Sequence, residues 1–167
     1  ISHQYAFQYH IPRAGTDPVS EAVMRNFAPV DIGIGLHWHH FDQPILPPVI
    51  ETPIIAQQIQ RNKVVIYLPF EDQQQVMKLL SPFKEFEFFI YSPENVTSPY
   101  AHIHCKPLSL HGFQKDLSDC TGIICNAGFE LASESLQLGK KILVKPVHAQ
   151  MEQTSNAAAL QLLGYGK

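Results

Sequence analysis

The fold of this chain is decided by residues 119–134, DCTGIICNAGFELASE. The apolar run from Gly122 to Cys125 predicts a strand, Asn126-Ala127-Gly128 a tight turn, and Phe129 the start of a helix. Such a unit directs backbone N–H groups to the space above the C-terminal end of the strand. Open α/β sheets bind ligands there, often phosphates. An ordinary β–α turn explains the same residues without a ligand.

The predicted helix has one polar face and one apolar face. Glu130, Ser133, Glu134 and Gln137 fall at positions i, i+3, i+4 and i+7, so they share a face. Ala132 and Leu136 lie on the other side, which suits packing against a sheet.

Composition indicates a globular protein and excludes two classes of partner. The chain has 167 residues, of which 45% are hydrophobic and 16% charged. A formal net charge of -3 gives no basic surface for nucleic acid. No apolar run approaches the roughly 18 residues of a membrane span, and the first residues do not resemble a signal peptide. The odd number of cysteines, Cys105, Cys120 and Cys125, favours reduced thiols in a cytoplasmic protein.

Strands and helices alternate from Lys63 onward. The strands are expected at 64–68, 86–91, 102–105, 122–125 and 142–146, and the helices at 72–80, 112–120, from 129 and at 151–163. In the helix at 72–80 we expect Val76, Leu79 and Leu80 to face the core. This pattern predicts an α/β fold with a Rossmann-like parallel sheet and helices on both faces. A sixth strand would follow residue 163, and none is predicted.

Residues 1–50 are too few to close a core of their own. A short helix is predicted at 20–27 and a strand at 31–39, with Ile32, Ile34, Leu36 and Trp38 on one face. Three prolines between 44 and 48 indicate an extended linker. We therefore expect residues 1–50 to be the tail of a preceding domain plus a linker, and 51–167 a second, truncated domain. Since the chain starts with Ile and stops soon after its last predicted helix, we expect a fragment of a longer protein.

Three pieces read together resemble a known family. They are residues 125–134 (CNAGFELASE), 143–146 (LVKP) and 152–157 (EQTSNA). Their order and spacing are similar to the donor-binding half of GT-B glycosyltransferases, particularly the family 28 and UDP-glucuronosyltransferase types. The resemblance covers about 63–167, and more loosely 1–50 as the tail of the acceptor domain.

The resemblance implies a set of donor-binding residues. Glu134 would accept hydrogen bonds from the ribose hydroxyls, and the turn at Asn126, Ala127 and Gly128 would hold the diphosphate. The donor sugar would contact Glu152 and Gln153, and the loop at Pro107 and Leu108 would read the uracil. Glu130 and Ser133 complete the set, on the helix face that carries Glu134. A plain turn, a solvated helix face and an acidic first helical turn are the structural alternatives.

The sequence also departs from that family. Asn126 stands where the family has His or Ser, and Ala127 replaces its first Gly. Glu130, in the first turn of the helix, would repel a diphosphate. Lys145 or His148 could offset that charge.

The resemblance implies a metal-independent, inverting enzyme that transfers a sugar from a nucleotide sugar, with UDP as the expected carrier, to an acceptor hydroxyl. It needs no cofactor. The catalytic base would belong to the amino-terminal domain, so this fragment would bind nucleotide without turnover. The acceptor would be a glycan, a lipid-linked molecule or a small molecule, and the other partner is the protein's own amino-terminal domain. A homodimer formed through the unpaired edge of the sheet is a further possible partner. The protein is expected in the cytoplasm, either in solution or at the periphery of a membrane.

Two other hypotheses keep the fold. A nucleotide-sugar 2-epimerase has a similar donor half, and a non-catalytic module could retain the fold with a filled site above Gly128. The histidines of 37–40 and 102–104 suggest a metal, but zinc or iron needs at least about three converging ligands. Alternating apolar residues explain both segments as edge strands, so no metal is predicted.

Overall fold

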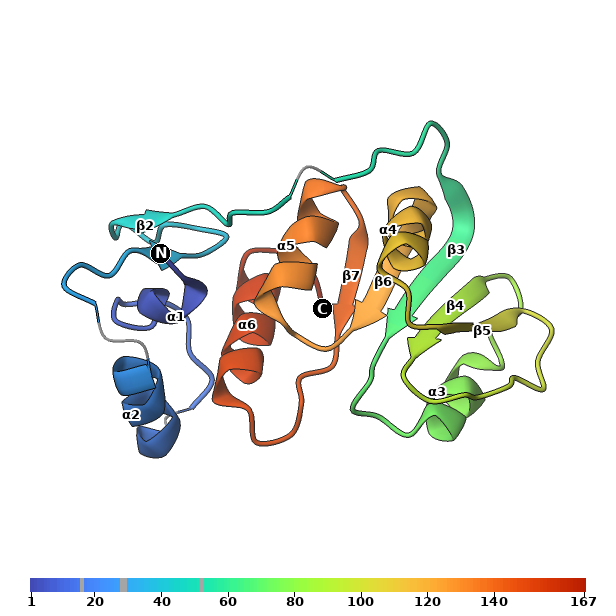
Figure 1. Cartoon of the computed structure of the whole chain (residues 1–167), viewed down its shortest axis with the longest axis horizontal. Helices are drawn as coiled ribbons and strands as arrows, with labels where there is room; N and C mark the ends of the chain where they lie inside the picture. The colour runs from blue at the N-terminus through green and yellow to red at the C-terminus, as the bar shows by residue number, and fades with distance from the viewer. Residues whose placement is uncertain (16, 28–29, 52) are drawn as a thin grey trace.

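The computed structural model describes residues 1–15, 17–27, 30–51 and 53–167. An N-terminal part precedes an extended segment that leads into a five-stranded sheet flanked by helices (Figure 1). The N-terminal part contains α1 (His3–Ala6), α2 (Pro18–Phe27), β1 (Gly35–Leu36) and β2 (Ile45–Leu46). The rest contains β3 (Gln60–Tyr67), α3 (Gln73–Leu80), β4 (Glu87–Ser92), β5 (Ile103–Pro107), α4 (Leu110–Asp119), β6 (Cys120–Cys125), α5 (Phe129–Gln137), β7 (Lys141–Val144) and α6 (Met151–Leu162).

The large sheet is parallel and has the strand order β5-β4-β3-β6-β7. From β3 the chain moves outward through β4 to β5, and then returns to lay β6 on the other side of β3. The order therefore reverses between β3 and β6. In open α/β sheets ligands bind beyond the C-terminal ends of the strands at such a point.

The two faces of the sheet have separate cores, which confirms the predicted layers. On one face α3 covers Ile66, Phe88 and Ile90. On the other face α4 and α5 cover Val65 and Ile123. The central strands are apolar on both faces, as expected for a parallel sheet with helices on both sides. Asp72 caps α3 and Ser109 caps α4, each accepting from N–H groups of the first turn.

The prediction that Leu79 faces the core is wrong, because its side chain is 73% exposed. Met77, which is 1% exposed, takes its place in the core. Its side chain lines an apolar groove of about 690 Å³ between α3 and the sheet. The groove floor is formed by residues of β3, β6 and β7, including Val64, Ile124 and Leu143. The helical period identifies an apolar position, but it does not say whether another element covers it.

The N-terminal part differs from the prediction in its strand. Only Gly35 and Leu36 of the predicted strand at 31–39 are paired, with Ile45 and Leu46, and Ile32 is 81% exposed. The short helix is confirmed and begins at Pro18 rather than residue 20. The predicted boundary between residues 50 and 51 stays a prediction.

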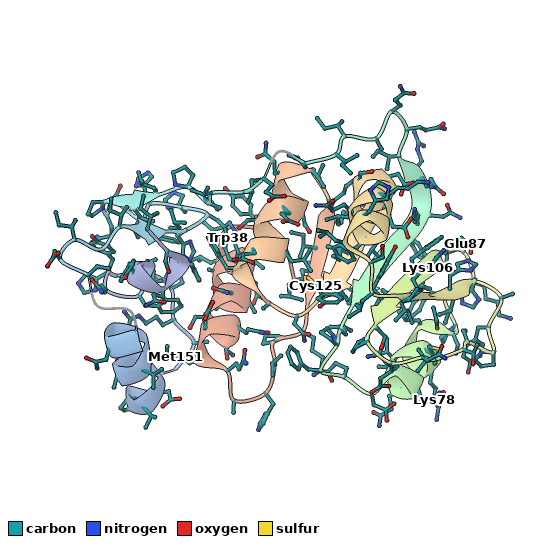
Figure 2. All side chains as sticks on the ribbon, in the orientation of Figure 1. Trp38, Lys78, Glu87, Lys106, Cys125 and Met151 are labelled. Atoms are coloured by element: carbon teal, nitrogen blue, oxygen red, sulfur yellow. The ribbon has the colours of Figure 1, made fainter. Side chains whose placement is uncertain are left out.

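Helix α6 joins the two parts. Met151, at its start, packs with Ala6, Phe7, Ile11 and Ile45 of the N-terminal part. Figure 2 labels Met151 at the end of α6 that lies beside the N-terminal elements. The Ser155 hydroxyl accepts a hydrogen bond from the Ala14 N–H at 3.2 Å. In Figure 1, α6 lies between the N-terminal elements and the sheet.

The last residue of the chain forms backbone hydrogen bonds with the edge strand β7. The Lys167 N–H donates to the Ile142 carbonyl at 3.2 Å, and the Val144 N–H donates to the Lys167 carbonyl at 2.7 Å. This is the hydrogen-bond pattern of a parallel pair. Lys167 therefore lies beside β7, in the position that a sixth strand would take.

A buried lysine fixes α4 to β3. Lys63 is 3% exposed, and its Nζ donates to Asp116 at 2.8 Å and to Asp119 at 2.5 Å. The Tyr91 hydroxyl donates to the other Asp116 oxygen at 2.6 Å. Burial raises the pKa of Asp116, but the hydrogen bonds from Lys63 and Tyr91 outweigh it, so the pKa lies below its ordinary value of 3.8.

Replacing Lys63 is expected to destabilise the domain strongly. Lys63→Met leaves two partly buried carboxylates without their cation, which costs about 3 kcal/mol or more. The loss shrinks as the pH falls below 3.8, because a carboxylate with a lowered pKa contributes stability only while it is ionised. Urea unfolding checks this, with Lys115→Met at an exposed position of α4 as the control. Equal losses in the two variants would contradict this role of Lys63.

Candidate functional site

The turn after β6 lies at the point where the strand order reverses. Cys125 ends β6 and pairs with Tyr67 at the end of β3. Gly128 then occupies the N-cap of α5, and among the described residues no side chain caps that helix. The first N–H groups of a helix have no partner within it, and the helix dipole makes this end positive. The end of α5 is therefore suited to an anion.

Gly128 leaves room for a ligand at this turn. A Cβ placed on Gly128 would meet no heavy atom of residues 1–15, 17–27, 30–51 or 53–167 within 4 Å. Its φ of -70° is ordinary for any residue. The glycine is therefore not required by the backbone conformation, and its lack of a side chain keeps the approach to α5 open.

The other two residues of the predicted diphosphate turn use their N–H groups inside the protein. Asn126 donates from its backbone to the Tyr67 carbonyl at 3.3 Å, and Ala127 donates to Gln153 Oε1 at 3.2 Å. Of the three backbone N–H groups predicted to hold the diphosphate, these two are thus already engaged. The N–H groups from Gly128 onward remain the candidates.

Asn126 carries an unusual buried oxygen. Its amide nitrogen donates to the Lys145 carbonyl at 2.8 Å, which fixes the orientation of the amide. Its Oδ1 is buried and has no hydrogen-bond partner within the described part of the chain. An unpaired buried acceptor is rare in native proteins. The position holds His or Ser in the family that the sequence resembles.

Gln153 braces the turn from α6. Its Oε1 accepts hydrogen bonds from the N–H groups of Ala127 and Val147, at 3.2 and 3.0 Å. It therefore ties the loop after β6 to the loop after β7, a role that the prediction of a sugar contact did not include. Its neighbour Glu152 is exposed, in the first turn of α6.

Glu134 and Glu130 lie on α5 in different environments. Glu134 is half-buried, and burial, together with the charges of Glu130 and Glu51, raises the pKa of its carboxyl above the usual 4.5. Glu130 is exposed in the first turn of the helix. A partly desolvated carboxylate beside other acids is typical of functional sites.

Ser133 does not lie on an open polar face, and that prediction is wrong for this residue. It is 4% exposed, and its hydroxyl donates to the Phe129 carbonyl at 2.7 Å. The same oxygen accepts from Trp38 Nε1 at 2.8 Å. Trp38, which Figure 2 shows beside α5, therefore covers Ser133. The single hydroxyl hydrogen of Ser133 is already used.

Two further predicted contacts can be placed. Lys145 forms an ion pair with Glu71, in the loop after β3, rather than offsetting Glu130. Pro107 ends β5, and both it and Leu108 are exposed. Like the turn after β6, they lie at the C-terminal end of a strand, so both lie on the same side of the parallel sheet. Three strand spacings of about 4.8 Å separate β5 from β6.

A cluster of aromatic rings at the start of α5 was not predicted from the sequence. The Phe129 ring stacks on His3, with centroids 3.8 Å apart and planes at 5°. Trp38 stacks on Phe129 at 5.1 Å. His37 is also buried, and burial and the charges of His3 and His39 lower its pKa to about 3. No local pattern announces these contacts, because they join the N-terminal part to α5.

In the described residues, no group of three or more His, Cys, Asp and Glu side chains is arranged to hold a metal ion. Nor does any helix of the described ranges combine the length and apolar character of a membrane-crossing segment.

Comparison with known proteins gives one family and one fold. The model of the family described as "Glycosyl transferase family 1" matches residues 39–167. No curated protein matches the chain. Among solved structures, the chain is similar to the spinosyn rhamnosyltransferase SpnG (20% identity, TM-score 0.52), covering 75% of this chain and 38% of that one.

Two further structures share the fold. The glycosyltransferase SnogD from Streptomyces nogalater has 18% identity and a TM-score of 0.50, over 93% of this chain and 42% of that chain. The glycotransferase of kitacinnamycin has 12% identity and a TM-score of 0.52, over 76% and 35%. The chain thus spans well under half the length of these proteins.

The family match extends from the end of the N-terminal part through all five strands of the large sheet. The solved structures confirm the Rossmann-like fold of a GT-B half. This chain belongs to glycosyl transferase family 1.

Proposed function

We propose that this chain is the donor-binding part of a glycosyltransferase that transfers a sugar from a nucleotide sugar, with UDP as the carrier, to an acceptor hydroxyl. One observation carries the proposal: α5 begins uncapped at the point where the strand order reverses, with open space at Gly128. Family membership and the glycosyltransferases among the similar structures support it.

The chemistry of the site suits departure of a diphosphate. The N–H groups at the start of α5 and the helix dipole would stabilise the negative charge that develops on the leaving group. This needs no metal ion. Glu134, less than two turns further along the same helix, offers two acceptor oxygens to the ribose diol. Pro107 and Leu108 would border the base.

The rest of the reaction is assigned to groups outside this chain. Inversion requires a base that activates the acceptor hydroxyl, and we place it in an amino-terminal acceptor domain. Binding of the acceptor also requires that domain, so nucleotide binding without turnover is the expected behaviour of residues 1–167. The three unpaired cysteines support a cytoplasmic site of action.

The two acidic residues of α5 should differ in their effect on UDP binding. Glu134→Ala should weaken binding about tenfold, because a charge-assisted hydrogen bond contributes about 1.5–3 kcal/mol. Glu130→Gln should leave binding unchanged or tighten it, since it removes a negative charge from the helix end that holds the diphosphate. Isothermal titration calorimetry measures both. Equal affinities in wild type and Glu134→Ala would refute the ribose assignment.

The pH dependence of that binding follows from the raised pKa of Glu134. The ionised carboxylate is the better acceptor, so UDP affinity should fall as the pH is lowered through the raised pKa, which lies above 4.5. In Glu134→Gln this part of the pH profile should be absent. A profile that is identical in the two proteins would count against an ionised Glu134 in the site.

Gly128→Ala should separate binding from folding. The φ of -70° and the open space around it predict a change in stability within about 0.5 kcal/mol. The added methyl group should nevertheless weaken UDP binding, because it stands where the diphosphate must approach. Gly122→Ala is the matched control: its Cβ would lie 2.9 Å from the Lys141 carbonyl, so it should destabilise the sheet. Unchanged UDP affinity in Gly128→Ala would place the diphosphate elsewhere.

A further inference from the structure

His3 is buried between the N-terminal part and the donor-binding turn, and both its ring nitrogens face oxygen atoms. Nδ1 lies 2.9 Å from the Leu36 carbonyl oxygen, and Nε2 lies 2.9 Å from Asn156 Oδ1. The side chain is 8% exposed. Water therefore has little access to either contact.

The orientation of Asn156 is set by its other contact. Its Nδ2 donates to the Ala127 carbonyl at 2.9 Å. If the amide were turned round, its oxygen would face that carbonyl, and two acceptors would meet. Oδ1 must therefore face His3, and Asn156 is itself buried at 1% exposure.

Only one protonation state of His3 completes these contacts. A neutral imidazole carries one N–H, and the Leu36 carbonyl and Asn156 Oδ1 both require a donor. With one proton, either contact is left as a repulsion between lone pairs. The imidazolium donates at both nitrogens, and an unbroken chain of hydrogen bonds then runs from Leu36 through His3 and Asn156 to Ala127.

The charges around His3 oppose one another. Burial lowers its pKa below 6.5, although the hydrogen bonds to Leu36 and Asn156 and the charge of Glu152 on α6 act to raise it. His37 stays neutral, since its pKa is lowered to about 3, and the charge of His3 contributes to that shift. The neutral ring therefore prevails in the unliganded protein at neutral pH. A negative charge brought close to His3 favours its charged form.

The Phe129 ring of α5 also favours the protonated form of His3. It stacks face to face on His3 and belongs to the first residue of the helix whose N-terminus faces the ligand. A cation over an aromatic face is stabilised by the ring. The imidazolium thus contacts the donor-binding turn on two sides, through Asn156 and through Phe129.

We propose that His3 is a positioning residue that takes up a proton when an anionic diphosphate binds at α5, and that the imidazolium then holds the turn through Asn156. The inference rests on the proposed function for the identity of the anion. Linkage makes the effect reciprocal, so protonation of His3 tightens diphosphate binding by the factor by which binding favours protonation.

The first test needs no ligand. The ¹⁵N resonances of the His3 ring and the backbone amides of Gly128 and Phe129 are followed by NMR between pH 5 and 8. We expect the amide resonances to titrate together with the His3 ring in wild type. Asn156→Leu removes the hydrogen bonds that link His3 to Ala127. In this variant the Gly128 amide resonance should no longer follow the titration of His3. Amides that ignore the His3 titration in wild type would overturn the inference.

The second test measures proton uptake. UDP is titrated at pH 7 in two buffers of different ionisation enthalpy, using wild type, His3→Phe and Trp38→Phe. Phe at position 3 keeps a ring to stack on Phe129, but it donates no hydrogen bond to the Leu36 carbonyl or to Asn156 Oδ1. Trp38→Phe keeps a ring in the same cluster and removes only the hydrogen bond to Ser133, so it controls for a general loosening of the contact between the two parts.

Wild type and Trp38→Phe should take up a fraction of a proton that His3→Phe does not. Titration of the UDP phosphate itself, with a pKa of about 6, is common to all three proteins. Below neutral pH the affinity of His3→Phe should be reduced relative to wild type, by up to tenfold for each pH unit over which His3 titrates.

The outcomes separate the two proposals. If wild type binds no UDP while the Gly128 amide follows His3, the donor assignment fails and the coupling stands. If UDP binds with the same proton uptake in wild type and His3→Phe, the coupling fails and the donor assignment stands.

Discussion

The parallel pairing of β6 with β3 is the constraint on which the rest of the structure depends. Four consecutive pairs, from Val64 with Gly122 to Tyr67 with Cys125, align the ends of the two strands. Because β4 lies on the other side of β3, the strand order reverses here, and α5 begins beyond the C-terminal ends of β3 and β6. Gly122 permits the close approach of β7, since a Cβ there would lie 2.9 Å from the Lys141 carbonyl.

The turn that follows β6 is held from α6 rather than by its own residues. Gln153 accepts from the Ala127 N–H, and Asn156 donates to the Ala127 carbonyl. Both residues lie on α6, and Met151 at the start of α6 packs against the N-terminal part. The geometry of the turn therefore depends on residues that lie outside the sheet, which gives the N-terminal part a direct influence on the proposed ligand site.

Much of the sheet could be predicted from the sequence because its signals are local. The apolar strands, the capping residues Asp72 and Ser109, and the turn at Gly128 each lie within a few residues of the element they define. The contact between His3 and Asn156 joins residues 153 positions apart and has no local signature. Leu79 and Ser133 were misplaced for a related reason: the helical period fixes the face on which a residue lies, whereas the covering element comes from elsewhere in the chain.

A crystal structure of residues 1–167 with bound UDP would show whether the start of α5 holds the nucleotide. We expect the diphosphate within hydrogen-bond distance of the Gly128 and Phe129 N–H groups, the ribose hydroxyls on the Glu134 carboxylate, and the base toward Pro107. A nucleotide bound away from the start of α5, for example in the apolar groove beside α3, would contradict it.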